Sequence, residues 1–157
     1  MFNLSKASFI TIPVSLLFVQ GAHAVTQVVP FHSAVEPTCV ITLDSSGVMA
    51  TNGLFKLDSA AAGGAPGRAT ILTTGDSFNV TAVAPSAFTQ SPDGVGATTF
   101  LANYSASGVT DVASAPGDTA SRLGTGTTAL TVNLSAETSG NAFPAGQYQA
   151  DVTVTCE

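Results

Sequence analysis

Residues 147–156 read Gln147-Tyr148-Gln149-Ala150-Asp151-Val152-Thr153-Val154-Thr155-Cys156, and every even position is apolar while every odd position is polar. Successive side chains of a β-strand point to opposite faces. The stretch therefore predicts a strand with one face on a core and the other in water. No 3.6-residue amphipathic pattern persists beyond residue 24, so the chain is predicted to be all-β.

The same alternation recurs upstream of this stretch. It is clear in residues 78–84, 100–104 and 127–136, and weaker in residues 38–43, 53–58 and 68–73. Turn-rich sequence separates these segments, with residues 108–126 as the longest expected loop. About seven to eight short strands joined by turns indicate an antiparallel β-sandwich. Residues 25–35 form a further candidate strand, and Pro30 places it at an edge or outside the core sheet.

The N-terminus has the features of a secretory signal peptide over residues 1–24. Lys6 precedes an apolar run over residues 7–19, and Ala22-His23-Ala24 fits the small-x-small cleavage pattern. A transmembrane anchor is the alternative, but the run is shorter than the ~20 residues that a membrane span needs. We expect an exported protein in the periplasm, on the cell surface or outside the cell, with no membrane span after cleavage.

Composition bounds the remaining possibilities. The chain has 157 residues, of which 9% are charged, with ten acids and four bases. An acidic chain with so few bases does not neutralise a run of phosphates, so nucleic acid is excluded as a partner. The length fits one domain, which we expect at residues 38–157, preceded by an N-terminal arm or edge strand at residues 25–37.

The two cysteines, Cys39 and Cys156, favour one disulfide, because an even count in an exported protein is typical of disulfide bonding. Cys39 shares a strand face with Ile41, and Cys156 shares one with Val154. Both thiols are therefore expected to point inward and to join the first core strand to the last. No His or Cys pair has metal-ligand spacing, so neither a metal nor a cofactor is expected.

Catalytic residues are not apparent in the sequence. His32 is the one histidine after the expected cleavage site, and no nucleophile motif surrounds it. The acids fall singly in turns or at outward positions, whereas a glycosidase needs two converging carboxylates. A surface calcium site formed by loop acids near Asp111 and Asp118 remains an alternative. We expect a protein that is not an enzyme.

Two stretches resemble bacterial fimbrial subunits of the chaperone–usher type, and related small secreted proteins of unassigned role. One is residues 28–41, an alternating apolar segment followed by Cys39. The other is Ala145-Gly146-Gln147-Tyr148 with the alternating Val and Thr that follow. Many such subunits pair their first Cys within the first part of the domain, whereas here Cys156 is the one available partner.

The resemblance implies an incomplete immunoglobulin-like sandwich, into which a neighbouring subunit inserts its N-terminal segment as the missing strand. Residues 25–35, which we call the donor segment, would supply that strand. The side chains that would face the acceptor groove are Val25, Val29, Phe31 and Val35. The implied partners are further copies or other fimbrial subunits, together with a periplasmic chaperone.

Two functions therefore stay open. The first is a non-catalytic structural or adhesive subunit of a surface fibre that polymerises through its N-terminal strand. The second is a monomeric periplasmic or secreted β-sandwich module that binds a ligand with its loops at residues 85–96 and 108–126. In the second case residues 25–35 would be the domain's own first strand.

Overall fold

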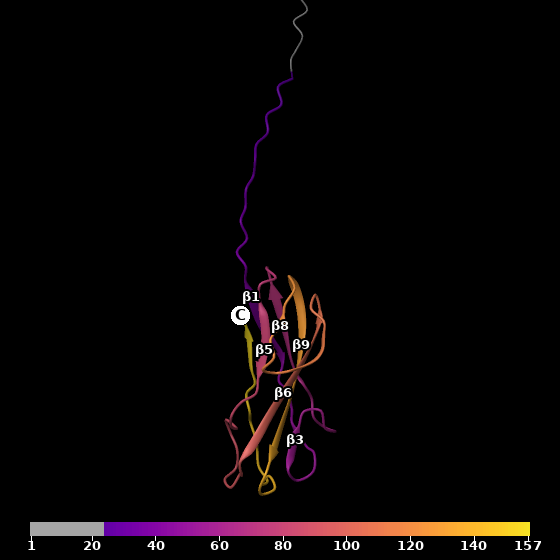
Figure 1. Cartoon of the computed structure of the whole chain (residues 1–157), viewed down its shortest axis with the longest axis vertical. Coiled ribbons are helices and arrows are strands. Elements are labelled where there is room, and N and C mark those ends of the chain that lie inside the picture. Colours follow the sequence, from indigo (N-terminus) through magenta and orange to yellow (C-terminus); the bar gives the residue numbers. More distant parts are fainter. Residues whose placement is uncertain (1–23) are drawn as a thin grey trace, which may run out of the picture. The chain divides into compact units, whose positions relative to one another are not determined.

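The computed structural model describes residues 24–157, so the expected signal peptide lies outside the described residues except for Ala24. Residues 34–157 form one compact unit, and residues 24–33 are described by themselves. The described residues contain no helix (Figure 1). Their strands are β1 (Cys39–Ser45), β2 (Ala50–Thr51), β3 (Lys56–Asp58), β4 (Gly67–Thr73), β5 (Asn79–Val83), β6 (Thr98–Gly108), β7 (Val112–Pro116), β8 (Ser121–Arg122), β9 (Gly126–Thr138) and β10 (Thr153–Cys156).

The strands form two antiparallel sheets, one of seven strands and one of three. Strand β9 is the centre of the larger sheet and pairs along its length with β6. On its other side β9 pairs first with β4 and then with β3. Strands β1, β2 and β7 continue this sheet outward, and the smaller sheet has the order β10-β5-β8. The all-β antiparallel class predicted from the sequence is confirmed.

The core is built from the alternate positions that the sequence pattern placed inward. Buried side chains recur every second residue along β9, where Leu130, Val132 and Leu134 are almost inaccessible. Leu130 and Val132 pack in one cluster with Ile71 of β4 and with Val80 of β5, which belongs to the smaller sheet. A core shared by the inner faces of both sheets is consistent with the expected sandwich.

Tyr104 of β6 joins the two sheets through its hydroxyl group. The residue is 1% exposed. Its hydroxyl oxygen lies 2.7 Å from the carbonyl oxygen of Thr119 and 2.6 Å from the Oγ of Ser121 in β8. A buried tyrosine normally finds such a partner for its O–H, and here the partners hold β8 against the larger sheet.

Gly117 lies where the chain leaves β7 and passes between the sheets. Its N–H donates to the carbonyl oxygen of Ala102 at 2.8 Å, and its own carbonyl accepts the N–H of Ala82 at the same distance. A Cβ at this position would clash directly with the carbonyl oxygen of Ala82. Only glycine permits the backbones to approach this closely.

The expected disulfide is confirmed. Cys39 and Cys156 are bonded, with their Cα atoms 6.4 Å apart. Cys39 begins β1 at one edge of the larger sheet, and Cys156 ends β10 at an edge of the smaller sheet. The bond therefore joins an edge of one sheet to an edge of the other.

Several sequence expectations are corrected by the structure. The described residues hold ten strands rather than seven or eight, because β2, β3 and β8 have only two or three residues each. The expected loop at residues 108–126 contains β7 and β8. Residues 25–35 belong to no strand in the described chain, and their pairing with another copy stays a prediction. The strand expected over residues 147–156 is present only as its last four residues, β10.

Candidate functional site

A groove of about 870 Å³ runs beside the edges of β1 and β10. One wall is the end of β1 with the following residues 46–49, and the other is the segment of residues 143–154. Ala69, Val132 and Leu134, all core residues, form part of its lining. The groove is thus a mostly apolar opening that reaches the core, with Arg68 and Asp151 also in its lining.

The wall at residues 148–152 explains why the strand expected there is shortened. Strand β10 pairs with β5 only from Thr153, opposite Val83, because Pro85 then turns the chain away. Beyond this point Gln149 forms an isolated bridge with Gln90. Residues 150–152 pair with no strand of the described chain. A segment with a strand-forming sequence thus lies along the groove and pairs with no neighbouring strand of the described chain.

The disulfide closes one end of the groove. Leu43 and Val154 line the groove, whereas Cys39 and Cys156 lie beyond them and are bonded to each other. From this bond β1 and the C-terminal segment continue as the two walls. In the described residues no disulfide closes the opposite end, which lies between residues 46–49 and residues 143–148, and we call it the open end.

Four aromatic rings stiffen the wall near the open end. Phe88 contacts the other three rings edge-on, with centroids 4.8 to 6.0 Å apart; they are Phe100, Phe143 and Tyr148. The Tyr148 hydroxyl donates to the carbonyl oxygen of Pro144 at 2.6 Å. Desolvation by burial raises the pKa of Tyr148 above its ordinary value. This packing holds the wall in place while its backbone edge stays unpaired.

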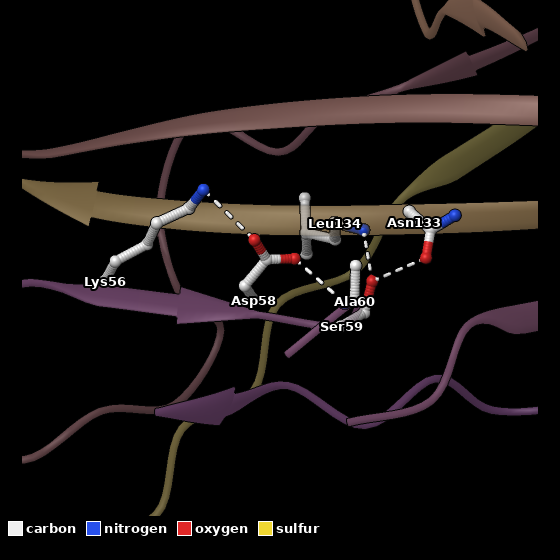
Figure 2. Close-up of polar contacts among 6 residues, drawn as sticks. All are labelled: Lys56, Asp58, Ser59, Ala60, Asn133 and Leu134. Carbon is white, nitrogen blue, oxygen red and sulfur yellow. Dashed lines mark hydrogen bonds and ion pairs between the residues drawn. The ribbon is translucent and has the colours of Figure 1, made fainter. Parts of the chain in front are cut away.

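A polar network fixes the end of β3 against β9 (Figure 2). The Nζ of Lys56 lies 3.0 Å from an Asp58 carboxylate oxygen, and the other oxygen accepts the N–H of Ala60 at 2.9 Å. Ser59 donates its Oγ–H to the Oδ1 of Asn133 at 3.0 Å and accepts the N–H of Leu134 at 3.0 Å. Ser59 is thus committed to structural hydrogen bonds at the groove lining.

The hydrogen bond from the Ala60 N–H is the main cause that lowers the pKa of Asp58 below its ordinary value. Desolvation opposes it, and the hydrogen bond and charge of Lys56 add to the lowering. The carboxylate is therefore ionised at neutral pH and anchors the turn after β3. The arrangement is that of a structural anchor rather than of a proton donor.

The chain just before β1 is held by Thr74. Its Oγ1 donates to the carbonyl oxygen of Glu36 at 2.9 Å and accepts the N–H of Thr38 at 2.8 Å. The Thr74 N–H donates to the carbonyl oxygen of Thr38 at 3.0 Å. These three bonds fix the chain where the donor segment meets the domain.

The structure places the sequence-predicted site residues in two groups. Cys39 and Cys156 are brought together. The candidate donor residues Val25, Val29, Phe31 and Val35 have exposed side chains and belong to no strand. The sequence analysis did not predict the groove. Its signal was the alternation of residues 147–156, together with Pro85 and with the turn-rich segment that precedes residue 147.

The described residues contain no cluster of three or more His, Cys, Asp or Glu side chains suited to a metal ion. The described residues also contain no helix that is long and apolar enough to cross a membrane. Comparisons with known proteins found no matching family model, curated protein or solved structure.

Proposed function

We propose that this chain is an exported, non-catalytic structural or adhesive protein, a surface-fibre subunit in which the donor segment of one copy fills the groove of another. The observation that carries the proposal is the unpaired wall at residues 150–152 beside an apolar groove. An unpaired strand edge offers a row of free N–H and C=O groups to an incoming strand. Such an addition would complete the strand that the sequence encodes.

The lengths of the two elements agree. The donor segment, residues 25–35, has eleven residues and would span about 36 Å when extended at ~3.3 Å per residue. The wall at residues 143–154, which lines the groove, has twelve residues. A single donor segment is therefore long enough to occupy nearly the whole groove.

The side chains of the donor segment also suit the groove. Its odd positions include Val25, Val29, Phe31 and Val35, which form an apolar row when the segment is extended. In β-strand addition the backbone bonds give affinity, and pockets for alternate side chains give register. Pro30 falls in the other row and removes one donor, as an added edge strand tolerates.

The root of the donor segment favours insertion into another copy. Thr74 holds Glu36 and Thr38, and Pro37 between them has a restricted φ. To enter the groove of its own domain, the segment would have to reverse direction at these three residues. The fixed root therefore supports exchange between copies, and with it a polymer.

The proposal carries the expected location and partners with it. Export would place the chain in the periplasm, on the cell surface or outside the cell, where the disulfide is stable. An open apolar groove and a free strand edge promote aggregation, so a periplasmic chaperone that covers them before assembly is part of the proposal. The proposal involves no cofactor.

The test compares the chain from Val25 onward with a donor-deficient variant, Val29→Asp with Phe31→Asp. The unchanged chain should form polymers, measured by sedimentation velocity, while the variant should stay monomeric. A synthetic peptide of residues 25–35 should bind the monomeric variant, whereas a peptide carrying the two Asp substitutions should not. A stable monomer of the unchanged chain that ignores the peptide would contradict the proposal.

The second candidate, a monomeric binding module, has one observation in its favour. A cavity of about 210 Å³ lies under the loop at residues 86–96 and is lined in part by Phe88 and Phe100. The other loop that this candidate function needs, residues 108–126, contains β7 and β8. The groove at β10 therefore carries more weight than this cavity.

A further inference from the structure

We propose that Leu54 and Phe55, at the tip of the β2–β3 hairpin, form a second contact between successive copies. We call these two residues the hairpin tip. The contact would be with an apolar row on the donor copy, formed by Val40, Leu72 and Val109. This inference rests on the proposed function, because it requires that copies associate through the groove.

The hairpin tip presents large apolar side chains to solvent at the open end. Leu54 is 70% exposed and Phe55 48% exposed. The carbonyl oxygen of Leu54 accepts the N–H of Phe143 at 2.9 Å, and Phe143 lines the groove. The hairpin tip therefore borders the place where an inserted segment would leave the groove.

The disulfide fixes the direction in which a donor segment lies. Because Cys39 and Cys156 join the two walls at one end, an inserted segment leaves the groove only at the open end. The donor segment therefore points its N-terminus toward the disulfide and runs antiparallel to β10. Its root, at Val35, then lies at the open end beside the hairpin tip.

The folded part of the donor copy must follow closely. Only residues 36–38 separate Val35 from the start of β1, a span of about 10 Å at ~3.3 Å per residue. Thr74 holds these residues against the domain. The first strand of the donor copy is thus brought next to the hairpin tip of the acceptor.

An apolar row lies at this end of the donor copy. Val40 is the second residue of β1 and pairs in register with Leu72 of β4, which pairs with Thr127 of β9. Val109 donates its N–H to the carbonyl oxygen of Thr127 at 3.1 Å and so extends the row. Val40, Leu72 and Val109 are each about half exposed.

The hairpin tip and the apolar row lie at opposite ends of the same domain. Strand β9 begins at Gly126 beside Thr73 and the disulfide end, and it ends at Thr138 beside Phe55. Two different patches that fit each other produce a head-to-tail contact, which builds an open filament. The hairpin tip would supply the large side chains that anchor such contacts.

The test uses the chain from Val25 onward with Leu54→Ser and Phe55→Ser. Its matched control is Leu101→Ser, an exposed leucine on β6 that pairs with Ser135 and belongs to neither patch. We expect polymers of the hairpin-tip variant to dissociate at least about tenfold faster on dilution than those of the control, which corresponds to about 1.4 kcal/mol. Light scattering after dilution measures the rate, and near-ultraviolet circular dichroism checks the fold.

Further measurements separate this inference from the proposed function. The peptide of residues 25–35 should bind the donor-deficient chain equally well with and without the hairpin-tip substitutions. Leu72→Ser with Val109→Ser should accelerate dissociation as the hairpin-tip variant does, and combining both pairs should add little, as for residues in contact.

Each remaining outcome has one meaning. Polymers of the hairpin-tip variant that dissociate like the control would overturn the second contact and leave the proposed function standing. Loss of peptide binding in the hairpin-tip variant would also overturn it, since Leu54 and Phe55 would then act through the groove. Failure of the unchanged chain to polymerise or to bind the peptide would remove the proposed function, and this inference with it.

Discussion

Removing the disulfide should cost more stability than any other pair of conservative substitutions in this domain. The perturbation is Cys39→Ser with Cys156→Ser, which keeps both side chains small. Without the bond, β10 is held in its sheet by a four-residue pairing with β5, from Thr153 to Cys156. Its other edge faces the groove and pairs with no strand of the described residues.

The size of the effect follows from the loop that the bond closes. The two cysteines are 117 positions apart, and for such a loop the chain-entropy relation gives about 4.8 kcal/mol at 25 °C. Small domains are stable by only about 5–15 kcal/mol in total. At roughly 3 °C per kcal/mol for a domain of this size, the melting temperature should fall by about 15 °C.

Urea unfolding of the oxidised chain and of the double serine variant, followed by circular dichroism, measures the difference. Both are studied in the donor-deficient background, so that association does not contribute. The reduced chain with its cysteines alkylated is the second comparison and should match the serine variant. A loss below about 1.5 kcal/mol would refute the reasoning, because it would mean that the unfolded chain gains little freedom when the loop is opened.

Three further predictions concern single residues. Tyr104→Phe should lower the urea-derived stability by about 0.5–1.5 kcal/mol, because the hydrogen bonds of the Tyr104 hydroxyl to Thr119 and Ser121 are lost; an unchanged midpoint would contradict this. Gly117→Ala should prevent soluble folding, since its Cβ would clash with a backbone oxygen, and a normal melting temperature would show that the backbones can separate. The lowered pKa of Asp58 stabilises the fold above the unfolded pKa, and this contribution is lost as the pH falls below about 4. Asp58→Asn should therefore flatten the acid side of the stability profile, as urea midpoints between pH 2 and 6 would measure, and an unaltered profile would exclude the residue.

The sequence predicted the parts of the fold that depend on one strand and its core face. The alternation in residues 127–136 predicted a strand with one face on the core, and Leu130, Val132 and Leu134 on that face are buried. The pairing of Cys39 with Cys156 was also expected, because both were predicted to lie on inward strand faces, although Ile41 on the face of Cys39 is 37% exposed. These features follow from the two-residue period of a strand, which each segment carries by itself.

The strands that the sequence did not predict correctly depend on an adjacent strand rather than on their own pattern of apolar and polar residues. Strand β8 has two residues, Ser121 and Arg122, and exists because β5 lies beside it. Two residues carry no periodicity that a reader of the sequence could detect. The expected strand at residues 147–156 is shortened for the converse reason, because β5 ends at Val83 and no strand replaces it.

The shortening of the strand expected at residues 147–156 bears on the choice between the two candidate functions. Natural proteins protect exposed strand edges with charges, prolines or bulges. The wall at residues 148–152 carries a single charge, Asp151, and no proline, and it lies beside an apolar groove. In a chain with only 9% charged residues, few groups are available elsewhere to discourage association. Such an edge is a liability for a protein that works as a monomer and a requirement for one that receives a strand, so it favours the fibre subunit over the binding module.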